Sequence, residues 1–258
     1  MWTRENLKKA AWNGLRLNYW KALLVSFILV LLSGGISGGF SFNSNFSNSD
    51  ISKIFKNYNF GTDFALQSDY IMGIIAAAIL LALVIGFFIF IFSNLFKIFV
   101  VSPFEVGQAR FFLDAKSKEG DLGNIIYSFK NKRYINVVKG MAWRLLFKYL
   151  WTLLFIVPGI VKGYAYSLVP YILADNPEMD YKRALKLSMD MTKGEKLNIF
   201  VLDLSFIGWF ILGFMACCIG TIFVYPYYFA TKAELYIALR EKAVMNGNVS
   251  LEELNIII

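Results

Sequence analysis

The chain has 258 residues, of which 57% are hydrophobic and only 17% are charged. Soluble domains use about 45–50% apolar and about 25% charged residues, so this composition excludes an ordinary soluble domain and indicates an integral membrane protein. A net charge of +8 would suggest nucleic acid as the partner of a soluble protein. Here the basic residues are distributed along membrane boundaries and nothing resembles a recognition module, so we expect no nucleic-acid binding.

The N-terminus begins with a mixed polar and apolar segment, residues 1–21, which we expect to be an amphipathic helix. The apolar run that follows, residues 22–40, has about 19 residues and would be roughly 28 Å long as a helix, enough to span a bilayer. Basic residues before this run and the small residues "SGGISGG" in it also match the parts of a cleavable signal peptide. We favour an uncleaved first span, because the polar segment is long and itself has a helical pattern.

Residues 41–69 are rich in Asn and Ser and have no apolar periodicity, so we expect a polar extracytoplasmic loop. The apolar run over residues 70–101 would be roughly 46 Å long as a helix, which exceeds the hydrocarbon core. This second span must therefore tilt or protrude. Charged residues return after it, and residues 104–133 are expected to form a cytoplasmic helical segment.

The second half of the chain alternates apolar runs with one polar segment. Residues 134–157 predict a third span that ends at Pro158-Gly159, and residues 160–174 predict a short fourth span. Residues 175–196 predict a second cytoplasmic helical segment, and the fifth span begins at Leu197. A sixth has only about 11 apolar residues, roughly 17 Å, so it is expected to cross obliquely, to sit within a bundle or to be re-entrant.

The clearest amphipathic segment is "NPEMDYKRALKLSMDMTKGEK". Asn176 is expected to cap its helix, with Pro177 and Glu178 in the first turn. The polar stripe is Lys182, Lys186, Asp190 and Lys193, and the other face is Tyr181, Ala184, Leu185 and Ser188. We expect this helix to lie along the cytoplasmic interface, its apolar face against lipid or the bundle and its lysines toward headgroups. Docking of a partner and a simple solvated connection are the alternatives.

The positions of the basic residues predict how the chain is oriented in the membrane. Of the 26 Lys and Arg residues, only Lys53, Lys56 and Lys162 would lie outside if the N-terminus is cytoplasmic. The positive-inside rule therefore predicts a multi-pass protein of the cell membrane, with about six spans and both termini in the cytoplasm.

The expected fold class is all-α, a polytopic membrane helix bundle with interfacial amphipathic helices. Three Pro-aromatic pairs near the ends of apolar runs favour three hairpin-like units: Pro103-Phe104, Pro170-Tyr171 and Pro226-Tyr227. Residues 1–243 are expected to form one membrane domain and residues 244–258 a cytoplasmic tail.

Three stretches carry a resemblance to a known family. They are "SPFEVGQARFFL" at 102–113, "VPYILADNPEMDYKRALKLSMDMTKGEKLNIFVLDLSFIGW" at 169–209 and "CIGTIFVYPYYFATKAELY" at 218–236. In these the chain resembles an uncharacterised bacterial membrane-protein family, domain of unknown function 975. The resemblance implies a multi-pass membrane protein and brings no established activity, substrate or catalytic residue.

The sequence offers little for catalysis. It contains no histidine, which excludes a Ser-His-Asp arrangement and a histidine-built metal site. It has no GxxxxGK[ST] phosphate loop, and Cys217 and Cys218 stand side by side in an apolar run, where we interpret them as small fillers. We therefore expect a non-enzymatic protein without cofactor or metal.

Charges at membrane depth are the candidate site. Inserting one near the bilayer centre costs roughly 2.5–3.5 kcal/mol, so each tends to be paired or to face water or protein. Arg144 and Lys148 share a face of the third span, and Asp203 sits at comparable depth in the fifth. We expect Asp203 to pair with Arg144 or Lys148, which would lock two helices together or line a polar groove. The secondary candidates are Lys162, Glu105, Lys232 and Glu234.

Three functional interpretations follow. The first is a non-enzymatic scaffold or accessory protein that interacts with membrane lipid, with a membrane protein partner or with itself. The second is a small transporter or peptide exporter, whose sign would be a water-accessible cavity lined by Arg144, Lys148 and Asp203. The third is an intramembrane enzyme, which would need reactive groups that meet in a cavity.

Overall fold

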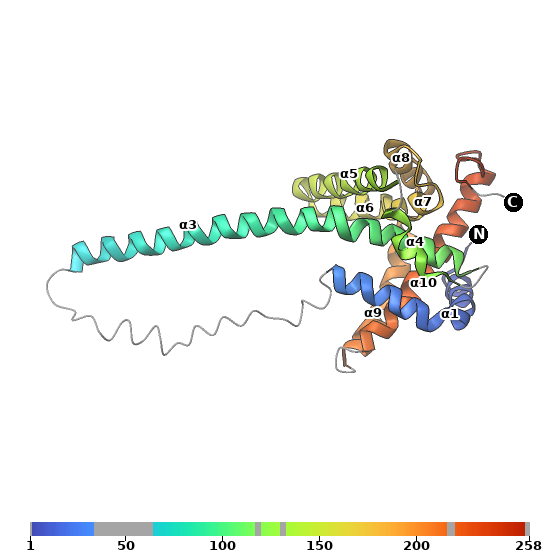
Figure 1. Ribbon diagram of the computed structural model, residues 1–258, viewed down its shortest axis with the longest axis horizontal. Coiled ribbons are helices and arrows are strands. Elements are labelled where there is room, and N and C mark those ends of the chain that lie inside the picture. Colours follow the sequence, from blue (N-terminus) through green and yellow to red (C-terminus); the bar gives the residue numbers. More distant parts are fainter. Residues whose placement is uncertain (1, 34–63, 117–119, 130–132, 216–219, 256–258) are drawn as a thin grey trace. The chain divides into compact units, whose positions relative to one another are not determined.

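The computed structural model describes residues 2–33, 64–116, 120–129, 133–215 and 220–255, and these ranges contain helices and turns but no strand (Figure 1). The all-α class is therefore confirmed. In chain order the helices are α1 (Arg4–Leu32), α3 (Phe64–Phe96), the π-helical η1 (Lys97–Val101), α4 (Ser102–Asp114), the 3-10 helix η2 (Leu122–Phe129), α5 (Arg133–Leu154), α6 (Ile156–Ala165), α7 (Val169–Asp175), α8 (Tyr181–Met191), α9 (Lys196–Met215) and α10 (Gly220–Met245). They belong to two compact units, Gly34–Phe96 by itself and Met1–Ser33 together with Lys97–Ile258.

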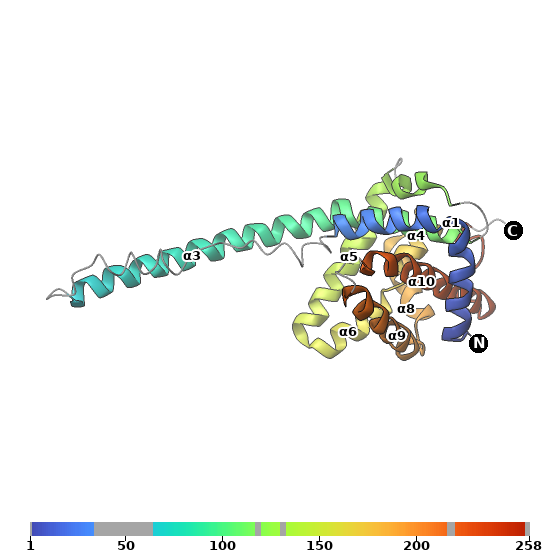
Figure 2. The ribbon, with the colours of Figure 1, turned by 90° about the horizontal axis from the view of Figure 1, so that it is seen from below.

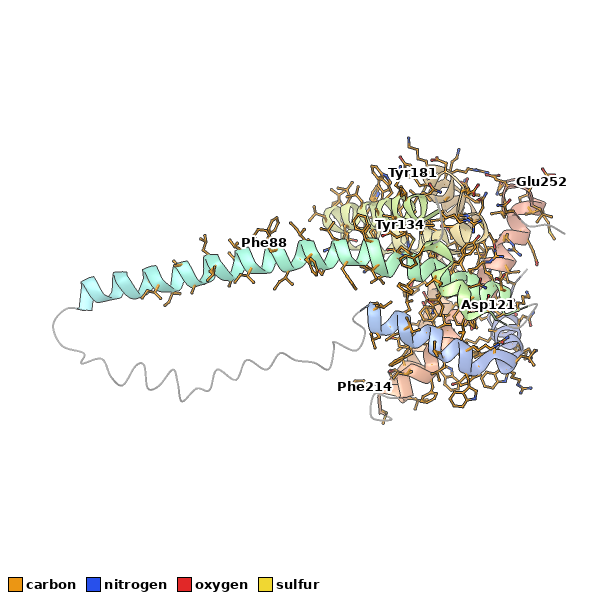
Figure 3. All side chains as sticks on the ribbon, in the orientation of Figure 1. Phe88, Asp121, Tyr134, Tyr181, Phe214 and Glu252 are labelled. Atoms are coloured by element: carbon orange, nitrogen blue, oxygen red, sulfur yellow. The ribbon has the colours of Figure 1, made fainter. Side chains whose placement is uncertain are left out.

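The smaller unit contributes α3, an apolar helix of 33 residues. Its side chains from Met72 onward are exposed apart from Asn94, and Phe88 extends freely from it in Figure 3. A helix that is apolar on all sides belongs in an apolar medium. The expected loop over 41–69 ends earlier than predicted, because α3 already begins at Phe64, where Ala, Leu and Gln favour a helix and no Gly or Pro breaks it. Residues 41–63 lie outside the described part of the chain.

In the larger unit, α1 begins behind Thr3, whose side chain accepts a hydrogen bond from the Asn6 N–H at 3.2 Å. It bends at Asn18, where the backbone is not helical, and Figure 2 shows the two arms. Asn18 is 3% exposed, and its Oδ1 accepts a hydrogen bond from the Gly120 N–H at 3.1 Å. The expected amphipathic segment and the start of the first span thus form one bent helix, since a buried polar side chain fixes the bend. Residues 34–40 of that span are outside the described ranges.

The core of this unit lies around α4, α7 and α10. Every residue of the short α7 is buried, and α7 packs against α4, α5 and α8. α10 packs against α1, α9 and α4. The outer helices bury one side each. In α1 that side follows a spacing of three and four residues through Leu7, Ala11, Leu15, Ala22, Val25 and Leu29, which is the helical period.

The chain from α5 to α7 is a hairpin followed by a broken helix. The turn lies at the extended Phe155, so the third segment ends at Leu154 and not at Pro158-Gly159, which instead lie in α6. Gly159 packs so closely on Thr152 that a side chain would overlap it. The helix then breaks after Ala165, whose carbonyl accepts a hydrogen bond from the Ser188 hydroxyl of α8 at 2.8 Å. A broken helix in an apolar bundle requires such a partner for the freed backbone group.

Helix α8 packs its apolar face against the bundle. Ala184, Leu185 and Ser188 are buried, whereas Lys182, Lys186, Asp190 and Lys193 are exposed, as the periodicity predicts. The predicted start at Asn176 is wrong, because α8 begins at Tyr181. Asn176 instead holds a turn before the helix, where its Oδ1 accepts a hydrogen bond from the Glu178 N–H at 2.9 Å.

The C-terminal segment after α10 folds back onto the turn before α8 and onto α8 itself. Arg183 donates from Nε to Glu253 Oε1 at 2.6 Å and from Nη2 to Oε2 at 3.1 Å. Asn176 donates to the Glu253 carbonyl at 2.9 Å. Val249 and Leu254 are buried. The expected tail over 244–258 therefore packs on the bundle as far as Leu254.

A first prediction concerns Gly107, where α4 touches η2. A Cβ at this position would overlap the carbonyl oxygen of Ile125, which is a backbone atom and not the end of a flexible side chain. Gly107→Ala should therefore lower the free energy of unfolding by more than about 1 kcal/mol, measured by thermal melting in detergent. The control is Gly208→Ala, where nothing lies within 4 Å of the added Cβ. This variant should raise the free energy of unfolding by up to about 1 kcal/mol, because Ala favours a helix more than Gly does. Equal melting temperatures for the two variants would contradict this packing.

A second prediction concerns pH. The hydrogen bonds from Arg183 hold the pKa of Glu253 below its ordinary value of 4.5. A lowered folded pKa stabilises the folded protein above pH 4.5, and this contribution is lost as pH falls through the folded pKa. The melting temperature of native protein should exceed that of Glu253→Gln near neutral pH, and the gap should close in acid.

The control for this pH experiment is Glu252→Gln, at an exposed neighbouring position (Figure 3). It should change the melting temperature little at any pH. A gap for Glu253→Gln that is independent of pH would contradict the ion pair.

Candidate functional site

A cavity of about 390 Å³ lies inside the larger unit. Its walls come from α4, α5, α6, α7, α9, α10 and the break before α7. The polar and charged residues among those that line it are Glu105, Gln108, Arg144, Lys148, Tyr164, Ser167, Tyr171, Asp203, Tyr228 and Lys232. Lys148 and Ile160 are exposed, so the cavity reaches the surface of this unit.

Helical spacing explains how two of the walls form. Glu105, Gln108, Ala109 and Phe112 recur at intervals of three, one and three and so share one face of α4. Arg144 and Lys148 are four residues apart on α5 and also share a face. The structure thus brings together Arg144, Lys148 and Asp203, as well as two of the secondary candidates, Glu105 and Lys232.

Two ion pairs lie in the cavity wall, and each joins two helices. Arg144 Nη1 donates to Glu105 Oε1 at 2.7 Å, which joins α5 to α4. Lys232 Nζ lies 2.5 Å from Asp203 Oδ1, which joins α10 to α9. The side chains of Lys232 and Asp203 are 12% and 24% exposed, so each compensates a charge that is largely removed from water.

The expected pairing of Asp203 with Arg144 or Lys148 is therefore wrong. Asp203 lies 12 residues before the end of α9 at Met215, and Lys232 lies 12 residues after the beginning of α10 at Gly220. In an antiparallel hairpin, residues equally far from the turn lie at the same depth, here about 18 Å from the helix ends. Sequence reasoning compared depths across separate hairpins and missed this closer match.

Two polar groups in the wall have no such compensation. Lys148 makes no ion pair with any residue in the part of the chain that the structure describes. Gln108 is 3% exposed, and its Nε2 finds no hydrogen-bond partner among the described residues. A buried amide without a partner costs roughly 1–3 kcal/mol, so it marks a place where a ligand or water is expected. Gln108 was not singled out from the sequence.

Aromatic side chains complete the wall around the Asp203 carboxylate. The Tyr164 and Tyr228 hydroxyls lie close enough to interact with it. Lys232 Nζ lies 5.5 Å from the centre of the Tyr228 ring. Tyr228 and Lys232 are four residues apart on α10, so this aromatic contact holds the lysine side chain against its own helix.

Two secondary candidates lie outside this cavity. Lys162 Nζ lies 5.0 Å from the centre of the Trp151 ring and 5.9 Å from that of Tyr166. Glu234 is 9% exposed and accepts a hydrogen bond from Lys116 at 2.9 Å, which ties α10 to the end of α4. Both fit structural roles.

A second charged cluster was missed from the sequence. Asp175, at the end of α7, is 7% exposed, and its Oδ2 accepts hydrogen bonds from Tyr236 at 2.7 Å and Arg240 at 2.8 Å. Arg110 Nη1 donates to the neighbouring Ala174 carbonyl at 3.3 Å. The cluster joins α7 to α10 and α4 and does not line the cavity. The available signal in the sequence was the spacing of Tyr236 and Arg240, which are four residues apart and so share one face of α10.

The cavity offers charged and hydrogen-bonding side chains to a ligand. Its carboxylates are each neutralised by a cation, and within the described ranges no group of three or more Cys, Asp or Glu residues could hold a metal ion. Cations, phenols and an amide can hold a polar ligand by charge and hydrogen bonding. Cys217 and Cys218 lie outside the described residues.

The described residues form an all-helical protein, and several of its helices have the length and composition of membrane spans. In the described residues, four helical stretches are long and apolar enough to cross a membrane: Arg4–Leu32, Met72–Asp114, Ile156–Asp175 with its break after Ala165, and Lys196–Met215. The model of the family described as "Protein of unknown function (DUF975)" matches residues 1–243, so the chain belongs to this family and the resemblance is confirmed. No curated protein and no solved structure matches the chain.

A third prediction tests the pairs by a double-mutant cycle on thermal stability in detergent. Asp203→Asn and Lys232→Gln should each destabilise the protein, because each leaves one buried charge uncompensated. Their losses should be non-additive by about 1 kcal/mol or more. The matched control combines Asp203→Asn with Arg144→Gln, whose losses should nearly add, because these residues belong to different pairs. Additive losses for Asp203 and Lys232 would contradict the pairing.

Proposed function

We propose that this chain is a multi-pass protein of the cell membrane that holds a polar ligand in the cavity and acts without covalent chemistry, as a small transporter or exporter of that ligand. The observation that carries the proposal is the cavity itself. It combines a volume of about 390 Å³ with five charged side chains in its wall. Ion pairs that only lock helices together need no space beside them, because protein interiors are otherwise close-packed.

The broken helix supports the same proposal. Ser167, Leu168 and Pro170, which lie in or beside the break between α6 and α7, line the cavity. Transporters place substrate sites beside interrupted helices, where irregular backbone faces a cavity and not lipid. The Ser188 hydroxyl supports the break from α8.

We further propose six crossings with both termini in the cytoplasm. Of these, α5 and α10 are not among the four helices that length and composition select. They are also the helices that carry Arg144, Lys148 and Lys232 into the cavity wall. Charges that face a polar cavity or an ion pair lower the apparent hydropathy of a helix without exposing charge to lipid.

A scaffold or accessory protein is the second candidate. The exposed lysines of α8 and of the turn after it, Lys182, Lys186 and Lys193, favour this candidate, because a basic face at the cytoplasmic interface attracts anionic lipid or a membrane protein partner. Self-association belongs to the same interpretation. In this case the cavity would be closed and without a role.

A fourth prediction separates the two candidates through cysteine accessibility, in a background with Cys217→Ala and Cys218→Ala. Ser167→Cys should react with a small charged methanethiosulfonate reagent in membranes open on both sides, because Ser167 lines the cavity. Leu212→Cys, on the exposed apolar side of α9, should not react, since a lipid-facing thiol stays protonated. Lys186→Cys should react only after cells are permeabilised. Absence of labelling at Ser167→Cys would favour the scaffold. Labelling of Lys186→Cys in intact cells would contradict a cytoplasmic position of α8.

A further inference from the structure

We propose that the cavity binds the anionic oxygen group, phosphate or carboxylate, of a small ligand, with Lys148 as its counter-charge and Gln108 as its hydrogen-bond donor. This inference deepens the proposed function and rests on it.

The charged side chains of the cavity wall indicate the sign of the ligand's charge. The cavity is lined by three cations and two carboxylates, which leaves one positive charge. Glu105 is engaged by Arg144, and Asp203 by Lys232. Both acids are thus occupied, so a cationic ligand would have to break an existing pair. Lys148, without an ion pair in the described part of the chain, is the charge still available, and it favours an anion.

Gln108 indicates independently that the ligand has hydrogen-bond acceptors. Its side chain comes from α4, faces the same cavity and is 97% buried, and its Nε2 has no acceptor among the described residues. An amide N–H₂ needs acceptor oxygens. A phosphate or carboxylate offers several, so one group can accept from the Lys148 ammonium and from the Gln108 amide together. Both donors come from the wall of one cavity, Gln108 from α4 and Lys148 from α5.

The size of the cavity bounds the ligand. A volume of about 390 Å³ corresponds to roughly 13 water molecules and lies within the range of small-molecule sites. The aromatic residues Phe112, Tyr164 and Phe229 offer apolar surface beside the polar groups. The fit is to an anion on a short organic stem, which is either a soluble molecule or the glycerophosphate headgroup of a lipid.

Protection of Ser167→Cys tests the inference in the full-length protein lacking Cys217 and Cys218. The protein is placed in phosphatidylcholine nanodiscs, and the rate of methanethiosulfonate labelling is measured while glycerol 3-phosphate is titrated at constant ionic strength. A parallel arm replaces part of the phosphatidylcholine by phosphatidylglycerol. Saturable slowing by glycerol 3-phosphate supports a soluble anion, and slowing only in phosphatidylglycerol supports a lipid headgroup.

Variants identify the residues. Lys148→Gln should raise the half-protecting concentration of the effective anion about tenfold or more, as expected for loss of a charge-assisted bond. The matched control Lys162→Gln should not change it, because Lys162 stacks on Trp151 outside the cavity. Gln108→Met should weaken protection and yet leave the melting temperature of the ligand-free protein equal or higher, since it removes an unpaired buried amide. A purely structural glutamine would lose stability instead.

The outcomes separate the two proposals. The anion site is overturned, and the polar cavity stands, in either of two cases. In the first, Ser167→Cys is labelled but neither anion slows the labelling. In the second, the anion protects Ser167→Cys equally well with and without Lys148→Gln. If position 167 does not label at all, the proposed function fails first. A melting temperature of Gln108→Met well below that of the native protein would remove Gln108 from the site.

Discussion

A charge that is taken into an apolar bundle must be compensated, and this requirement organises the larger unit. Asp175 joins α7 to α10, Glu105 and Arg144 join α4 to α5, and Asp203 and Lys232 join α9 to α10. Hydrophobic contacts alone permit many ways to pack apolar helices, whereas breaking one of these pairs costs several kcal/mol. The pairs therefore select one arrangement of the helices, and the residues of two of them, Glu105–Arg144 and Asp203–Lys232, also line the cavity.

Periodicity predicted well those features that depend on one helix at a time. The all-α class, the buried and exposed faces of α8 and the long apolar α3 all follow from the spacing of side chains. Features that depend on two segments were missed. The bend at Asn18 rests on Gly120, and the break after Ala165 rests on Ser188, 23 residues further on. The start of α8 was misplaced because the Asn176 turn resembles a helix cap in sequence.

The candidate site shows the same division. The sequence singles out Asp203, Arg144 and Lys148, because charges are rare in apolar runs, and all three line the cavity. Their partners were not predictable from depth across hairpins, since that comparison needs the relative placement of helices. Counting from the turn within one hairpin would have found Lys232. Gln108 gives no signal in the sequence, because an amide in a helix becomes informative only when its burial and its missing partner are known.

The position of the Asp203–Lys232 pair also bears on biogenesis. Both residues belong to consecutive helices, so their charges can neutralise each other as soon as α10 has been synthesised. In the proposed membrane arrangement, these two charges would enter the bilayer as a neutral pair and not singly, which lowers the cost of inserting α9 and α10. In that arrangement the α9–α10 hairpin would carry its own counter-charge into the membrane.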